Sequence, residues 1–237
     1  SMILKTLKRI IWIKKRLSRT SGFEVFYRLK QLINIVLIDR LRIYYQILPK
    51  FKENKEFKIT IDYKDLIKYN TKQYENILKI FTININPLTI DKWRYDYKND
   101  KNSSIKYAFS IERQNFEKQG DVKYIQEISR FYHLPVIGID GVTNNAESIK
   151  TIEKQLIQWK NQNPFLKSIN WTSGIEVAIR SVNLIYTHIL IKKFTNLPYE
   201  FDSILKYLLR LNYIFLKKHL SLYSSANNHL TAELMGL

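Results

Sequence analysis

The sequence contains no cysteine, six glycines, five prolines and four histidines among its 237 residues. Without cysteine the chain has no disulfide framework, no thiol nucleophile and no thiolate zinc site. Four histidines argue against a multi-histidine metal site, so we expect neither a metal nor a cofactor. The scarcity of glycine and proline excludes collagen-like and low-complexity chains.

Long apolar runs are also lacking, since none reaches the roughly 18 residues that a membrane span needs. The apolar residues near the N-terminus are interrupted by Lys14, Lys15 and Arg16. A secretory signal would need an unbroken apolar core and a small-residue cleavage site, and the sequence shows neither. The pattern therefore gives no sign of membrane insertion or export.

Positive charge is abundant, with 39 Lys and Arg against 21 Asp and Glu, which gives a formal net charge of +18. Residues 1–50 hold 12 basic and 2 acidic residues and so carry +10 of that surplus. Such a surplus favours a polyanionic partner, which could be an acidic polysaccharide, an anionic lipid surface or a nucleic acid. Because 45% of the residues are apolar, the chain is expected to fold around a sizeable core.

Most of the chain shows the periodicity of a helical protein. Apolar residues from Ile3 to Leu17 recur every three or four positions between basic residues, which predicts a basic amphipathic helix. That helix packs on its domain or contacts an anionic surface. A second helix is expected from Phe23 to Leu48. Further helices, joined as hairpins, are expected over residues 105–118, 121–133, 145–161, 172–194, 199–219 and from 228 onward.

Glycine and proline are expected in the connections between these helices, as at Gly120, Pro164 and Pro198. For the same reason we expect residues 135–145 to form the longest irregular connection. The domain organisation predicted is basic helices over 1–50, an irregular segment with short strands over 51–104, and helical hairpins over 105–237, all within one structural domain.

Within the irregular segment, residues 58–62 and 80–86 alternate as short strands do. Trp93, Tyr95 and Tyr97 follow among charged residues. These aromatic side chains either pack a loop or form a platform on which a sugar ring stacks.

One segment that could carry chemistry lies at the start of the helix expected over 172–194. Thr172 or Ser173 can cap this helix. Glu176 and Arg180 are then one turn apart, so they form an intrahelical ion pair or line a cleft in which Arg180 binds a carboxylate or sulfate. Trp171, just before the helix, either lies in the core or stacks on a pyranose ring.

A second such segment is Asn227-Asn228-His229, at the expected N-terminus of the last helix. Asparagine is a preferred N-cap, so plain capping accounts for it. The alternative is an anion pocket, because amide, imidazole and free backbone N–H groups all donate and the helix dipole adds positive potential.

Such a pocket would suit the carboxylate of a uronic acid. β-Elimination of a uronide removes the C5 proton beside that carboxylate, and donors on the carboxylate stabilise the enolate-like charge that develops. A base must take the proton, and an acid must protonate the departing 4-oxygen.

Three ordered segments together resemble the N-terminal helical domain of the heparinase II/III-like polysaccharide lyases, which include alginate and heparan sulfate lyases. The matching residues are Trp159, Asn163-Pro164, Asn170-Trp171, Ser173, Glu176, Ala178, Arg180 and Ser221 to His229. Trp93 to Tyr97 and Ile111 to Arg113 match the family's Trp-x-x-Asp-Tyr and Glu-x-x-Arg segments more loosely.

The resemblance implies an incomplete α/α toroid that is normally followed by a β-sandwich domain. It implies β-elimination of an acidic polysaccharide of a cell-surface or capsule type. No metal or cofactor is implied for the helical domain. By the motif, Asn228 and His229 neutralise the substrate carboxylate. The candidate substrate-binding residues are Trp171, Glu176, Arg180 and Tyr223.

In that family the catalytic tyrosine and further histidine and arginine groups lie downstream of Asn-Asn-His, and this sequence ends eight residues after His229. We therefore expect a chain cut from a longer protein, with the β-sandwich domain as its missing partner and little activity on its own. The basic opening resembles members from surface-polysaccharide gene clusters, in the bacterial cytoplasm or envelope.

The rival interpretation is a non-catalytic binder of polyanions, either an acidic glycan or an anionic membrane surface. No nucleic-acid partner is expected, because no nucleic-acid-binding signature is visible. A helical structural domain with a degenerate site is the third alternative.

Overall fold

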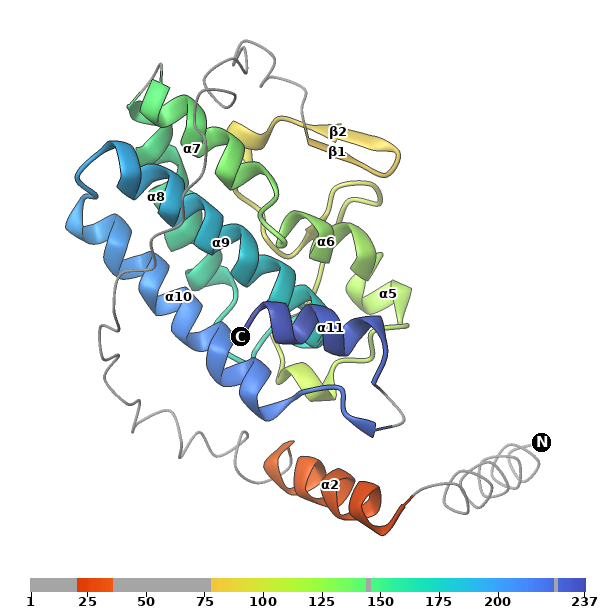
Figure 1. Cartoon of the computed structure of the whole chain (residues 1–237). Helices are drawn as coiled ribbons and strands as arrows, with labels where there is room; N and C mark the ends of the chain where they lie inside the picture. Colours follow the sequence, from red (N-terminus) through yellow and green to blue (C-terminus); the bar gives the residue numbers. More distant parts are fainter. Residues whose placement is uncertain (1–20, 36–77, 144–145, 224–225) are drawn as a thin grey trace. The chain divides into compact units, whose positions relative to one another are not determined.

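The computed structural model describes residues 21–35, 78–143, 146–223 and 226–237 (Figure 1). The chain divides into two compact units, and each is described by itself. The first comprises Ser1–Phe51 and Leu222–Ala226, and the second comprises Lys52–Ser221 and Asn227–Leu237. In the described residues both units are built mainly from helices, as the sequence predicts.

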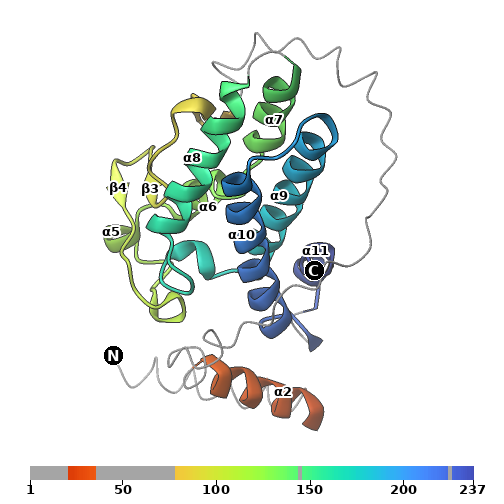
Figure 2. The same cartoon turned by 90° about the vertical axis from the view of Figure 1, so that its left-hand side faces the viewer.

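In the second unit the helix α9 (Gly174–Phe194) is central and contacts three other helices (Figures 1 and 2). Its neighbours are α7 (His133–Thr143), α10 (Tyr199–Lys218) and α11 (Asn228–Met235), and α8 (Glu147–Gln162) packs against α7 and α10. Shorter elements complete the unit, namely η4 (Pro87–Thr89), η5 (Ala108–Ser110), α5 (Phe116–Gln119), α6 (Val122–Ile128) and η6 (Ile169–Trp171).

The helices expected over 145–161, 172–194 and 199–219 are confirmed as α8, α9 and α10. Each buries a line of apolar residues, and the core that they share includes Ile152, Leu184, Leu205 and Phe215. Among the described residues, α9 is long and apolar enough to cross a membrane by length and composition. Half of its most apolar 18-residue stretch is buried in the structure.

The expectation of an irregular connection over 135–145 is wrong, because residues 133–143 form α7. Pro135 is the third residue of this helix, in the first turn, where a missing N–H breaks no intrahelical bond. The glycines allow close packing: a Cβ at Gly141 would lie 2.6 Å from Cγ1 of Ile149, and one at Gly138 would lie 3.4 Å from Cγ1 of Ile191.

The prediction of a helix over 105–118 is also wrong, since the described structure there has only η5 and the four-residue α5. Tertiary contacts override the helical pattern, because Ile111 packs with Val122, Ile125 and Ile169. After α5 the chain turns at Gly120, whose φ is +71°. The helix expected over 121–133 is confirmed in part, as the shorter α6.

Two small antiparallel hairpins make up the described strands. Residues expected as one strand over 80–86 belong instead to a hairpin of β1 (Leu78–Ile80) and β2 (Ile83–Ile85), which turns at Phe81, where φ is +52°. The second hairpin pairs β3 (Tyr95–Asp96) with β4 (Lys101–Asn102). The strand expected over 58–62 lies outside the described residues.

The first unit contains α2 (Gly22–Ile33), which Ser21 caps by accepting a hydrogen bond from the backbone N of Glu24. It includes the beginning of the helix expected over 23–48. The remainder of that helix, and the basic helix expected over 3–17, lie outside the described residues.

Candidate functional site

The Asn-Asn-His segment forms the start of α11. Asn227 is the N-cap, and its Oδ1 accepts a hydrogen bond from the backbone N of His229 at 2.8 Å. Asn228 and His229 are the first two residues of the helix, and both side chains are exposed. Asn227 therefore caps the helix. The donors of Asn228 and His229 lie at the positive end of the helix dipole and are open to solvent.

A buried carboxylate fixes α11 in place. Glu233 is 1% exposed and accepts hydrogen bonds from the backbone N of Ser221 at 2.6 Å and from its Oγ at 2.8 Å. Two glycines make room for this helix on α9. A Cβ at Gly174 would lie 2.2 Å from Oε1 of Glu233, and one at Gly236 would lie 2.6 Å from Cα of Ala178. Ser221, the first residue of the matching segment Ser221 to His229, thus anchors the helix that presents Asn228 and His229.

Arg180 is sandwiched between two tryptophans in the core. Its guanidinium carbon lies 4.4 Å from the ring centroid of Trp159 and 4.8 Å from that of Trp171. It donates from Nε and Nη2 to Oδ1 of Asn212, at 3.3 and 3.1 Å, and from Nη1 to the carbonyl of Asn170 at 3.3 Å. Burial lowers the pKa of Arg180 to about 9, which still leaves it protonated at neutral pH.

This burial bears directly on two of the expected substrate contacts. Trp171 is 0% and Arg180 is 1% exposed, so neither side chain can reach a sugar in this structure. Of the two alternatives for Trp171, the core position is the one observed. The guanidinium of Arg180 satisfies protein acceptors rather than a substrate carboxylate or sulfate.

Glu176 pairs with Arg130 and not with Arg180. Arg130 donates from Nε to Oε2 of Glu176 at 2.6 Å and from Nη2 to Oε1 at 2.9 Å, a bidentate pair. Its Nη1 donates to Oε2 of Glu127 at 2.6 Å. The expected intrahelical ion pair is therefore replaced by one that joins α9 to the end of α6. Burial raises the pKa of Glu127, and the hydrogen bond to Glu176 raises that of Arg130.

The other motif residues tie the irregular segment to this core. Nδ2 of Asn170 donates to the carbonyl of Trp93 and to Oδ1 of Asn163, both at 2.9 Å. Nε1 of Trp171 donates to the carbonyl of Asn163 at 3.1 Å. Trp93 itself is buried, with its ring centroid 5.5 Å from that of Phe131. It therefore packs a loop and offers no platform to a sugar.

The aspartate of the Trp-x-x-Asp-Tyr segment organises a turn. Asp96 is 0% exposed and accepts hydrogen bonds from the backbone N of Lys98 at 3.0 Å, from Nδ2 of Asn99 at 2.7 Å and from the backbone N of Asp121 at 2.7 Å. A Cβ at Gly120 would lie 3.0 Å from Cβ of Asp96, so the chain approaches it closely there. These contacts set the start of α6.

Tyr223 belongs to the first of the two units. Its ring is 45% exposed, and its centroid lies 5.4 Å from that of Tyr27 on α2. The backbone at Tyr223 is left-handed, with φ of +56°. Its backbone carbonyl accepts a hydrogen bond from the backbone N of Ala226 at 2.8 Å.

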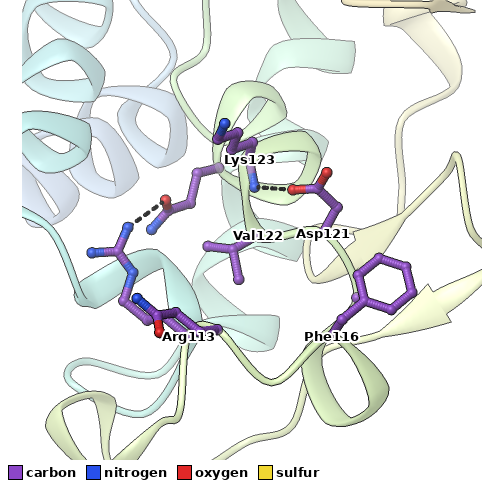
Figure 3. A pocket seen from close by; sticks show the side chains of 8 residues that line it. Arg113, Phe116, Asp121, Val122 and Lys123 are labelled. Atoms are coloured by element: carbon purple, nitrogen blue, oxygen red, sulfur yellow. Dashed lines mark hydrogen bonds between the residues drawn. The ribbon is translucent and has the colours of Figure 1, made fainter.

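A pocket of about 570 Å³ opens between α5 and α6 (Figure 3). The residues that line it are Arg113, Gln114, Phe116, Gly120, Asp121, Val122, Lys123 and Gln126. Arg113 donates to Oε1 of Gln126 at 3.3 Å, and Nε2 of Gln126 donates to the carbonyl of Ile169 at 3.0 Å and to Oγ1 of Thr172 at 3.2 Å. One amide side chain therefore connects the cationic edge of the pocket to the motif segment before α9.

No motif in the sequence points to this pocket, although Arg113 falls in the loosely matching segment Ile111 to Arg113. Arg113 and Lys123 supply positive charge, Asp121 a single negative charge, and Phe116 a half-exposed ring. Cationic donors beside an aromatic ring are groups that can bind an acidic sugar.

No group of three His, Asp or Glu side chains within the described ranges could hold a metal ion. Comparison with protein-family models, curated proteins and solved structures found no match.

Proposed function

We propose that this chain provides the helical, carboxylate-binding part of a polysaccharide lyase of the heparinase II/III-like type, acting on a polysaccharide that contains uronic acid. The observation that carries the proposal is the exposed Asn228-His229 pair at the start of α11, held there by the buried Glu233. The helical hairpins of the second unit agree with the toroid that the resemblance implies.

In this proposal Asn228 and His229 act on the carboxylate beside the C5 proton. The amide N–H of Asn228 and the imidazole of His229 donate hydrogen bonds to the carboxylate oxygens, and the helix dipole favours the same negative charge. Both interactions strengthen as the enolate-like charge develops, so they lower the barrier to removing the proton. The proposal assigns no base within this chain, because the family places its tyrosine after the Asn-Asn-His segment.

The pocket between α5 and α6 supports the acidic character of the substrate. Arg113 and Lys123 both line this pocket, and Oε1 of Gln126 orients the guanidinium of Arg113 by accepting a hydrogen bond from it at 3.3 Å. A polymer that carries a carboxylate on each repeat can present several acidic groups to one protein. We therefore expect the glycan to bind the second unit at more than one cationic position.

The test is the ultraviolet absorbance of the unsaturated uronide, measured on a panel of uronic-acid polymers. The 237-residue chain and any longer product of the same gene are assayed side by side, together with binding of the same polymers to the chain. Asn228→Ala and His229→Ala are each expected to reduce binding of the preferred polymer about tenfold, the loss of one or two charge-assisted hydrogen bonds.

Two matched controls separate a substrate contact from a structural effect. Asn196→Ala replaces another exposed asparagine, in the connection between α9 and α10, and should leave binding unchanged. Asn227→Ala removes the cap and should lower the stability of the chain by about 1 kcal/mol. Equal binding by Asn228→Ala, His229→Ala and Asn196→Ala would refute the assigned roles.

The second candidate function is non-catalytic binding of polyanions, which the +10 charge of residues 1–50 favours. A binder of this kind would lose affinity steeply as salt concentration rises and would be indifferent to Asn228→Ala. A lyase subsite would lose affinity on Asn228→Ala. It would also prefer one uronide over the others, and this preference would persist at high salt concentration.

A further inference from the structure

The helix α2 in the first unit has an apolar side that is exposed. Five large residues along it are between 52% and 79% exposed: Phe23, Phe26, Leu29, Leu32 and Ile33. Phe23, Phe26, Leu29 and Leu32 are three residues apart and Ile33 is four residues after Leu29, so the five side chains cover roughly half of the helix circumference. Monomeric soluble proteins rarely display so many large apolar side chains on one short helix unless a partner covers them.

The other side of α2 is engaged within its own unit. Glu24 is 6% exposed and lies 3.6 Å from Nη2 of Arg28, and Arg28 also donates to the carbonyl of Leu222 at 3.4 Å. The ring centroids of Tyr27 and Tyr223 are 5.4 Å apart. Because the polar side is held in this way, the orientation of α2 in the first unit leaves the apolar side facing outward.

The chemistry of the partner follows from the charge next to this helix. Residues 1–20, directly before α2, hold seven Lys or Arg and no Asp or Glu. On α2 itself, Lys30 is exposed. A helix with phenylalanine and leucine on one side, in a cationic segment, has the composition of helices that lie in the interface of an anionic membrane.

We propose that α2 docks on an anionic lipid bilayer, with the side that carries Phe26 and Leu29 inserted among the acyl chains. A soluble polyanion such as a glycan would match the charge but would give these apolar side chains nothing to pack against. A second copy of the chain would cover them but would bring two strongly basic segments together. An anionic bilayer matches both the basic charge and the exposed apolar side chains, and the proposal does not depend on the proposed lyase function.

The absence of cysteine makes a site-specific test direct. Phe26→Cys is labelled with an environment-sensitive fluorophore, and Tyr199→Cys is the matched control, since Tyr199 is 80% exposed on α10 in the other unit. Each labelled chain is mixed with vesicles of phosphatidylglycerol and phosphatidylcholine, and with vesicles of phosphatidylcholine alone. We expect a blue shift at position 26 on the anionic vesicles, weakened by high salt, and none at position 199.

A second measurement asks whether the apolar side chains carry the binding. The double substitution Phe26→Ser with Leu29→Ser removes two exposed groups and no core contact, so circular dichroism should be unchanged. The partition onto anionic vesicles should fall about tenfold or more, whereas Tyr199→Ser should have no effect.

Three results would overturn the proposal. Unchanged partition of the double serine variant would mean that charge alone binds the vesicles. A blue shift at position 26 that appears without vesicles and grows with protein concentration would assign the face to a second copy. The absence of any blue shift at position 26 on anionic vesicles would exclude a lipid partner.

Discussion

The contact between α9 and α11 predicts an unusual response to Gly174→Ala. Replacing a glycine in a helix with alanine normally stabilises the helix, by up to about 1 kcal/mol at an interior position. At Gly174 the new Cβ would lie 2.2 Å from Oε1 and 2.8 Å from Cδ of Glu233, a separation that real atoms do not adopt. The carboxylate of Glu233 must therefore move.

The magnitude follows from the bonds that this movement breaks. Glu233 accepts hydrogen bonds from the backbone N and the Oγ of Ser221, at 2.6 and 2.8 Å, in a position that is 1% exposed. Hydrogen bonds to a charged group contribute about 1.5–3 kcal/mol each. Losing most of one and straining the other should lower the free energy of unfolding by about 3 kcal/mol, which outweighs the gain in helix propensity.

The assay is urea unfolding of four chains: the wild type, Gly174→Ala, Glu233→Ala and the double variant. Truncating Glu233 removes the atoms that the new Cβ meets. Gly174→Ala should therefore no longer lower the stability of a chain that already carries Glu233→Ala. We expect a coupling free energy of about 2 kcal/mol between the two sites. Gly22→Ala is the matched control, since a Cβ there meets no atom within 4 Å at the start of α2.

The local effect should concern α11 more than the rest of the unit. Amide hydrogen exchange should speed up over residues 228–235 in Gly174→Ala and stay slow in α8 and α10. Strictly additive free energies, or a Gly174→Ala chain as stable as Gly22→Ala, would refute the close packing of Glu233 on Gly174.

Two further predictions concern buried charge. Burial lowers the pKa of His133 to about 4 from 6.5, so the unfolded chain binds a proton that the folded chain does not as pH falls from 6.5 towards 4. Stability should fall by about 3 kcal/mol over that window, and urea midpoints of His133→Gln, which cannot titrate, should lack this contribution. Glu176→Gln should lower the free energy of unfolding by about 2 kcal/mol, because it weakens a bidentate, largely buried pair with Arg130. The equivalent change at the exposed Glu112 should have no measurable effect, and equal effects at both positions would contradict this account.

The elements that the sequence predicts well are those whose apolar periodicity is long and uninterrupted. α8, α9 and α10 fall within two residues of their expected bounds, because each repeats buried residues at helical spacing over 16 to 21 positions. α7 was not predicted, because Pro135, Gly138 and Gly141 look like breakers to local rules. The two glycines act through tertiary packing, because Gly138 lets Ile191 and Gly141 lets Ile149 pack directly on the helix.

In the candidate site, too, the contacts between residues close in sequence can be predicted and those between distant residues cannot. Capping by Asn227 follows from local sequence, since the bond to the N of His229 spans two residues. The partner of Glu176 does not, because Arg130 is 46 residues away and competes with the nearer Arg180. Arg180 lies instead between two tryptophans, where its planar guanidinium stacks on both rings while its N–H groups reach Asn212 and the carbonyl of Asn170.

The burial of the motif residues changes what the resemblance can support. Trp159, Trp171 and Arg180 form a core network, so they stabilise the framework of the second unit and are not exposed to a substrate. The exposed groups that this framework positions are Asn228 and His229 on α11. Because Glu233 and Ser221 hold that helix from behind, substitutions in the framework should act through stability, and substitutions at the exposed pair should act on binding alone.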